Sequence, residues 1–163
     1  MALITSLTES IPDLNYEYHT ITIDSIGQSS ANTFTCYLEQ PVRNVVQARL
    51  LAAHIHSNIS TEHCYISIDE LDTNFNDRAS NTLGGQPTMT VLRNSFASLV
   101  TADTELISFK NDYPIVTQYI DPIRSIDRFR VTIRDQSGAT IKNPDAAGHN
   151  FLVIRFVCRK PNL

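Results

Sequence analysis

Apolar and polar residues alternate most regularly between Ile126 and Asp135. The residues of one face are apolar: Phe129, Val131 and Ile133. The residues of the other face are polar and mostly basic: Arg128, Arg130, Thr132 and Arg134. Because successive side chains of a strand point to opposite faces, this pattern predicts an antiparallel strand with one buried and one exposed side. The residues just before it, around Pro122, predict a loop.

Further segments have strand patterns: Tyr16 to Ile26, Thr33 to Leu38, Cys64 to Leu71, Leu106 to Phe109, Val116 to Ile120 and Phe151 to Cys158. The first two are expected to be neighbours, with a hairpin as one arrangement, since a turn at Gly27 separates them. The last is apolar on both faces apart from Arg155, so we expect it at the centre of a sheet.

The segment from Val45 to His56 is apolar enough to be either a strand buried on both faces or a short helix, and we favour the strand. A new segment is expected to begin at Pro41. The polar stretch from Asp72 to Pro87 is rich in Asn, Asp and Gly and predicts a loop.

About eight strands with long loops and no strong helix predict an all-β fold. We expect an antiparallel two-sheet sandwich, with a single jelly roll as the leading topology. The chain of 163 residues is expected to form one domain over residues 16–163. Residues 1–15 are expected to form an N-terminal arm, of a kind that often reaches a neighbouring subunit.

The composition argues against two classes of function and indicates the compartment in which the protein is made. The net charge of -4 argues against a broad nucleic-acid-binding surface, and no direct nucleic-acid partner is expected. No apolar stretch approaches the roughly 20 residues that span a bilayer, so no membrane span is expected. The three cysteines, Cys36, Cys64 and Cys158, are predicted to be reduced residues, the first and last within apolar strand patterns, in a protein made in a reducing compartment.

Two stretches carry residue types that bind metals. His54, His56 and His63 lie near Cys64, and the first two would share one face of a strand, but histidines at a strand end explain them better than zinc. The stretch from Asp72 to Asp77 opens like a calcium loop. It lacks the glycine and glutamate that such a loop needs at its sixth and twelfth positions, so Asx turns explain it better. No cofactor is expected.

The sequence also lacks the signs of a reaction centre. No serine, cysteine or threonine stands in a Gly-x-Ser-x-Gly or comparable turn, and no glycine-rich loop precedes a Lys and a helix. Asp69 and Glu70 are adjacent in a predicted strand and would therefore point to opposite faces, unable to share a site. An enzyme is not expected.

The arginine row Arg128, Arg130 and Arg134 has two interpretations. It could pair with acidic residues of a neighbouring strand, or it could grip the carboxylates of a partner protein. Pairing is the favoured interpretation, and the interface remains a hypothesis.

Three stretches carry a family resemblance. Tyr119 to Ile123, Ile126 to Asp135 with Gly138, and Asn150 to Phe156 together resemble the C-terminal half of jelly-roll capsid proteins of large eukaryotic double-stranded DNA viruses and their virophage relatives. The resemblance covers about half of the chain and rests on the order of turn, strand, turn and final apolar strand. Val45 to Ser57 followed by Tyr65 to Leu71 is more loosely similar to an earlier strand pair of that family.

The resemblance implies a structural role in a virion. A chain with one jelly roll is similar to a penton protein at fivefold vertices or to a minor capsid protein that cements capsomers. The implied partners are further copies, for example in a pentamer, the major capsid protein and other minor capsid proteins. Synthesis in the host cytoplasm is implied as well. The alternative is a carbohydrate- or receptor-binding jelly-roll module of a virion, for which Phe75 and Tyr113 are the loop aromatics.

Overall fold

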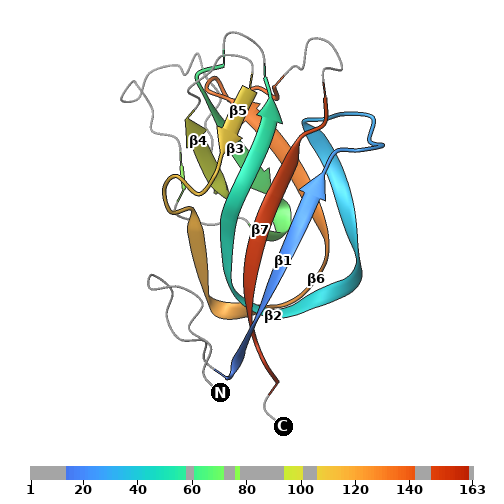
Figure 1. The fold of residues 1–163 in the computed structure, drawn as a ribbon, viewed down its shortest axis with the longest axis vertical. Coiled ribbons are helices and arrows are strands. Elements are labelled where there is room, and N and C mark those ends of the chain that lie inside the picture. Colours follow the sequence, from blue (N-terminus) through green and yellow to red (C-terminus); the bar gives the residue numbers. More distant parts are fainter. Residues whose placement is uncertain are drawn as a thin grey trace.

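The computed structural model describes residues 14–57, 61–71, 76–77, 94–100, 106–141 and 148–161. These residues form an all-β structure in which every strand pairing is antiparallel (Figure 1). The elements in chain order are β1 (Tyr16–Asp24), β2 (Thr33–His56), β3 (His63–Ile68), the 3-10 turn η1 (Asp69–Leu71), β4 (Ala97–Val100), β5 (Leu106–Phe109), β6 (Val116–Asp135) and β7 (Phe151–Arg159). Within the described part, no helix is long and apolar enough to cross a membrane.

Strands β2 and β6, of 24 and 20 residues, pair with each other through a sharp bend (Figure 1). Tyr37 pairs with Arg128 and Val42 pairs with Ile126, so β2 uses five residues here where β6 uses two. Val45 pairs with Ile123 and Gln47 pairs with Gln118, so β2 uses two residues here where β6 uses five. Each excess forms a bulge, and a bulge bends its strand and increases the local twist. Two bulges on opposite strands therefore fold the whole ribbon over.

Proline lies in each bulge, Pro41 on β2 and Pro122 on β6. Proline has no N–H to donate to a ladder and is tolerated where pairing is interrupted. Asn44, just beyond the first bulge, has a φ of 53°, a left-handed conformation that asparagine adopts more readily than most residues. The expected break at Pro41 and the expected loop around Pro122 are therefore wrong, because both prolines bend a strand without ending it.

The bend gives the sheet two halves that curl toward each other. In one half, β7 lies between β1 and β2, and β5 and the start of β6 pair with the other edge of β2. In the other half, the start of β2 pairs with the end of β6, followed by β3 and β4. Phe129 of β6 and Phe156 of β7 belong to different halves, and their rings stack with centroids 5.6 Å apart. The core thus fills the space between the halves.

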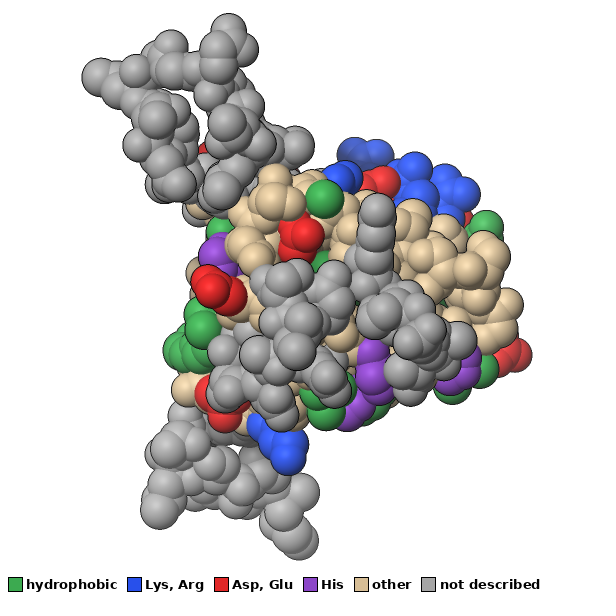
Figure 2. All heavy atoms as spheres, turned by 90° about the horizontal axis from the view of Figure 1, so that it is seen from above, with side chains coloured by type: hydrophobic (Ala, Val, Ile, Leu, Met, Phe, Trp, Pro, Cys, Tyr) green, Lys and Arg blue, Asp and Glu red, His purple; other side chains and the backbone are tan. Residues whose placement is uncertain are grey.

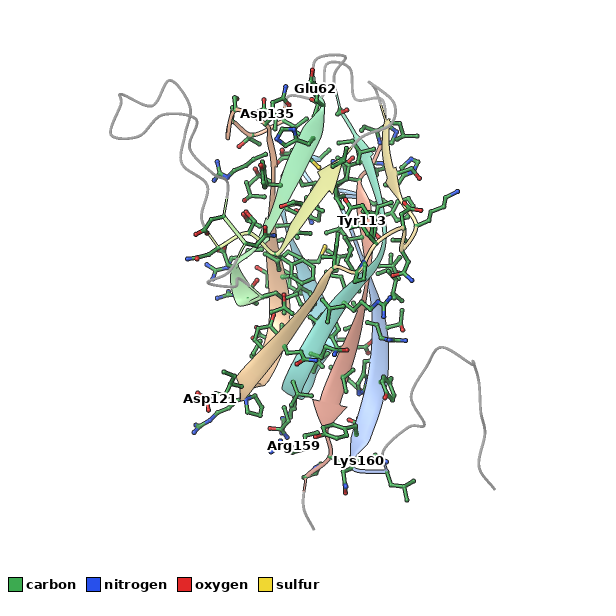
Figure 3. The ribbon with its side chains drawn as sticks, turned by 90° about the vertical axis from the view of Figure 1, so that its left-hand side faces the viewer. Glu62, Tyr113, Asp121, Asp135, Arg159 and Lys160 are labelled. Atoms are coloured by element: carbon green, nitrogen blue, oxygen red, sulfur yellow. The ribbon has the colours of Figure 1, made fainter. Side chains whose placement is uncertain are left out.

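Figure 3 places Asp121, Arg159 and Lys160 at one end of the molecule and Glu62 and Asp135 at the other. We name the first the bend end, because β2 and β6 fold over there, and the second the loop end.

A buried amide network holds the loop end together. The Asn150 side chain donates to the Ala31 carbonyl (2.9 Å) and to Asn32 Oδ1 (2.8 Å), and its Oδ1 accepts from the His56 N–H (2.7 Å). Asn32 Nδ2 donates in turn to the Ile141 carbonyl (2.6 Å). Both amides are buried and have partners for their polar atoms, as buried polar groups require.

Several expectations are confirmed. Phe129, Val131 and Ile133 are buried while Arg128 and Arg130 are exposed. The segment from Val45 to His56 is a strand, and β7 is central.

Two further expectations are wrong. Strands β1 and β2 form no hairpin, because β1 pairs with β7 along its whole length. The strand expected from Cys64 to Leu71 ends at Ile68, where η1 begins. Residues 1–13 of the expected arm, and most of the expected loop from Asp72 to Pro87, lie outside the described residues.

Candidate functional site

Arg130 of the predicted arginine row is paired with two acidic side chains of η1. Its Nε donates to Glu70 Oε1 (2.9 Å) and lies 3.4 Å from Asp69 Oδ2, and its backbone N–H donates to Glu70 Oε2 (2.8 Å). The hydrogen bond to Glu70, with the charges of Glu70 and Asp69, raises the pKa of Arg130. For Arg130 this geometry matches the pairing interpretation, although its partners lie in a 3-10 turn and not in a neighbouring strand. It also corrects the expectation that Asp69 and Glu70 could not share a site, because a 3-10 turn does not alternate its side chains as a strand does.

The other two arginines of the row have different surroundings. Arg134 donates from Nη1 to the Gly138 carbonyl in the turn that follows β6 (3.2 Å). Arg128 is exposed and lies directly opposite Tyr37 of β2, whose side chain is also exposed. Figure 2, which views the molecule from the loop end, shows Lys and Arg side chains gathered on one side with acidic side chains among them. An interface role for this row stays a prediction.

The structure brings two of the three candidate histidines together. The rings of His54 and His56 lie with centroids 5.1 Å apart, and His54 also stacks on Phe151 at 5.0 Å. His63 lies on β3, with its ring against Tyr65. Across the described ranges, no group of three or more His, Cys, Asp or Glu side chains could hold a metal ion.

The surroundings of His54 oppose its protonated form. Partial burial, followed by the nearby His56 and Lys110, lowers the pKa of His54. The backbone of Gly148 packs against the His56 ring so closely that an added Cβ would lie 2.5 Å from Cε1. This histidine pair therefore belongs to the packing between the end of β2 and the start of β7.

All three cysteines are free thiols. Burial raises the pKa of Cys64 to about 12, and burial with the nearby Glu17 raises that of Cys158 to about 11. Burial also raises the pKa of Cys36, whose Sγ donates to the Asp24 carbonyl (3.0 Å). Thiols of this kind are poor nucleophiles at neutral pH.

Of the two predicted loop aromatics, Phe75 lies outside the described residues. Tyr113 packs on Phe109, and its hydroxyl donates to the Ser98 carbonyl (3.1 Å) and accepts from the Val100 N–H (3.3 Å). It therefore ties the turn after β5 to the edge strand β4.

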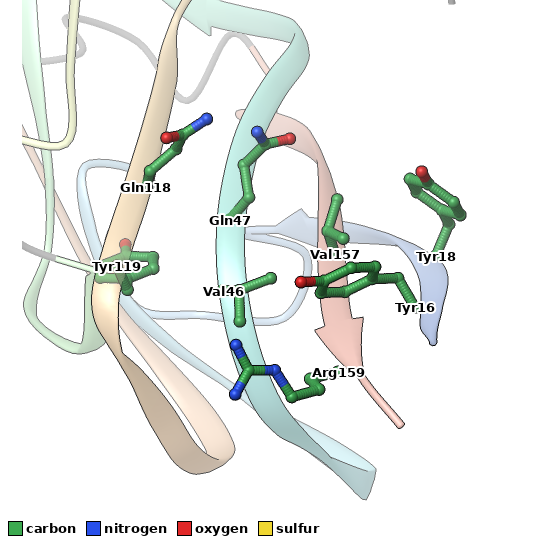
Figure 4. A pocket seen from close by; sticks show the side chains of 8 residues that line it. All are labelled: Tyr16, Tyr18, Val46, Gln47, Gln118, Tyr119, Val157 and Arg159. Atoms are coloured by element: carbon green, nitrogen blue, oxygen red, sulfur yellow. The ribbon is translucent and has the colours of Figure 1, made fainter. Parts of the chain in front are cut away.

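A groove that the sequence did not reveal crosses four strands on the outer face of the sheet toward the bend end (Figure 4). It has a volume of about 340 Å³ and is lined by Tyr16, Tyr18, Val46, Gln47, Gln118, Tyr119, Val157 and Arg159. A second groove of about 410 Å³ lies between the start of β1 and the bend of β2, and Arg159 lines both. These residues come from distant parts of the chain, so no local motif could have identified them.

Exposed apolar side chains also flank the bend end. Ile120 lies in the β6 bulge and is 98% exposed, and Tyr37 precedes the β2 bulge and is 74% exposed. Leu14, two residues before β1, is 87% exposed. The adjoining Asn15 carbonyl accepts from the Lys160 N–H (2.8 Å), which holds the start of β1 beside the end of β7.

No protein-family model matches this chain, and no curated protein matches it either.

Proposed function

We propose that this chain is a structural protein of an icosahedral virus shell. In this role it is either the penton at the fivefold vertices or a minor capsid protein that cements neighbouring capsomers. Its partners would be further copies of itself, the major capsid protein and other minor capsid proteins, and its place would be the virion after synthesis in the host cytoplasm.

The order of strand pairing supports the single jelly roll that this role assumes. The first half, β1–β7–β2 with β5 and the start of β6, and the second half, β2–β6–β3–β4, each supply four neighbouring strand positions. A jelly roll has eight strands in two such sheets. On this interpretation β2 and β6 each supply a strand to both sheets, and β5 shares one position with the start of β6, so the seven strands fill eight positions.

The observation that carries the proposal is the set of exposed apolar side chains in and around the bend. Ile120, Tyr37 and Leu14 expose most of their side-chain surface there, and Pro41 and Pro161 at the same end are exposed as well. Pro41 and Pro161 line the same groove, and exposed apolar side chains that gather on a folded surface are typical of protein contact sites. Repeated heterologous contacts around such an end can close into a ring.

Sedimentation velocity of the purified chain tests the proposal. We expect a closed oligomer, with a pentamer indicating the vertex role, and we expect Ile120→Ser to weaken it. Ile26→Ser is the matched control, because Ile26 is a 64% exposed isoleucine in the turn that follows β1. A chain that stays monomeric at about 100 μM, a concentration at which micromolar contacts are formed, would leave only the cement role. That role predicts binding to preformed shells that Ile120→Ser abolishes, and a chain that neither oligomerises nor binds shells would refute the proposal.

A further inference from the structure

The groove on the outer face of the sheet has the size and the chemistry of a small-ligand site. Its volume of about 340 Å³ lies at the lower end of the 300–1,000 Å³ typical of ligand pockets. Its lining combines phenol rings, amides, valines and a guanidinium. A shell role does not account for this combination, so the following inference does not depend on the proposed function.

Four of the lining side chains form one row across four strands. Tyr18 of β1 is in register with Val157 of β7, Val157 with Gln47 of β2, and Gln47 with Gln118 of β6. Figure 4 shows both glutamine side chains on the same side of the groove. A glutamine amide both donates and accepts hydrogen bonds, as does a sugar hydroxyl. The backbone groups of β7 and β2 are used by ladders on both sides, so side chains make the contacts with any occupant.

The aromatic and charged members of the groove lie beside this row. Tyr16 is directly opposite Arg159 in the pairing of β1 with β7, and Figure 4 shows the Tyr16 ring and the Arg159 side chain both directed toward Val46. Arg155 lies over the Tyr18 ring, 5.7 Å from its centroid, and adds a second positive charge nearby. Within the described part of the chain, the ion pairs involve Arg130 and His19 and not Arg159.

We propose that this groove binds an acidic saccharide. The two glutamines bind ring hydroxyls, the tyrosine rings pack against the apolar face of a sugar, and the planar Arg159 guanidinium binds the carboxylate or sulfate in a bidentate manner. A saccharide fits better than an acidic peptide, because the glutamine amides suit sugar hydroxyls and the backbone groups of the two central strands, β7 and β2, are already used by ladders.

An array of sialylated, sulfated and uronate-bearing glycans with their neutral counterparts tests the proposal, followed by titration calorimetry of the glycans that bind. We expect binding of acidic glycans. Arg159→Gln should lower the affinity by about tenfold or more, because it removes a charge-assisted bidentate contact. The double variant Gln47→Ala/Gln118→Ala should lower the affinity by a similar factor. Arg128→Gln is the matched control, since Arg128 is an exposed arginine on the other half of the sheet. Its affinity should equal that of the unmodified chain. Thermal melting of each variant separates lost binding from lost folding.

Three results would overturn the proposal. The first is the absence of any glycan binding. The second is binding that Arg159→Gln and Arg128→Gln weaken equally, which would indicate general charge attraction. The third is Arg159-dependent binding of a glutamate-rich decapeptide without glycan binding, which would make the groove a protein interface.

Discussion

The stacking of Phe129 on Phe156 makes the packing of the two sheet halves measurable. Both residues are fully buried, and they come from the end of β6 and from β7, which lie in different halves. We consider Phe129→Leu, Phe156→Leu and the double variant. Leucine is chosen because alanine would cost about 3–5 kcal/mol at each site, and the pair could then approach the whole stability of a domain, about 5–15 kcal/mol.

The expected magnitudes follow from the geometry. Each single change leaves an apolar side chain in place and should lower the free energy of unfolding by about 1–1.5 kcal/mol. A stacked pair at 5.6 Å between centroids contributes about 0.5–1.5 kcal/mol beyond its buried area. This contribution is lost in either single variant, so the double variant should cost less than the sum of the two single changes by about that amount.

Urea unfolding of the four proteins, followed by circular dichroism, measures this coupling. A control cycle pairs Phe129→Leu with Phe109→Leu, since the Phe109 ring packs on Tyr113 instead. The control should be additive within about 0.5 kcal/mol. If the Phe129–Phe156 cycle is equally additive, the two rings do not touch in solution and the halves are not packed as described.

Four further predictions concern single positions. Asn150→Ala should lower the free energy of unfolding by about 3 kcal/mol in urea titrations, because it leaves several buried partners without hydrogen bonds; a loss below about 1 kcal/mol would show that water replaces the amide. Glu70→Gln should lower the melting temperature less than Asn150→Ala does, because the Arg130 side chain in its contact is half exposed to solvent; an equal loss would contradict this ranking. The pKa of His54 is lowered in the folded state, so its neutral form contributes stability that is fully present above the unfolded pKa of about 6.5 and is lost as the pH falls from there through the lower folded pKa. His54→Asn should therefore reduce the change of melting temperature with pH between about pH 7 and pH 5. An unchanged pH dependence would contradict the assignment. Cys64, with a pKa of about 12, should react with a thiol reagent only as fast as the protein unfolds, and rapid labelling of the folded chain at pH 8 would refute its burial.

The sequence predicted the buried faces of the strands well, because alternation is a local property. Phe129, Val131 and Ile133 face the core, and the apolar pattern of β7 correctly placed this strand at the centre of the sheet. Which strands pair with each other was harder to predict. Strand β1 pairs with β7, more than one hundred residues later in the chain, and no local pattern distinguishes that pairing from a hairpin with β2.

The prolines were interpreted as ends of strands because proline interrupts a ladder. At Pro41 and Pro122 the interruption is absorbed by bulges on opposite strands, so each strand continues past its proline. The groove residues were missed for a related reason. Tyr18, Val157, Gln47 and Gln118 form a row only once four strands are in register.

Hydrogen–deuterium exchange of the chain at low concentration and at the concentration of assembly is the most direct test of the claim that the bend end joins neighbouring subunits. Assembly should slow backbone exchange in residues 37–44 and 119–124, the two bulges and their surroundings, and leave residues 25–32 at the loop end unchanged. Protection confined to the loop end, or unchanged exchange throughout, would contradict the claim.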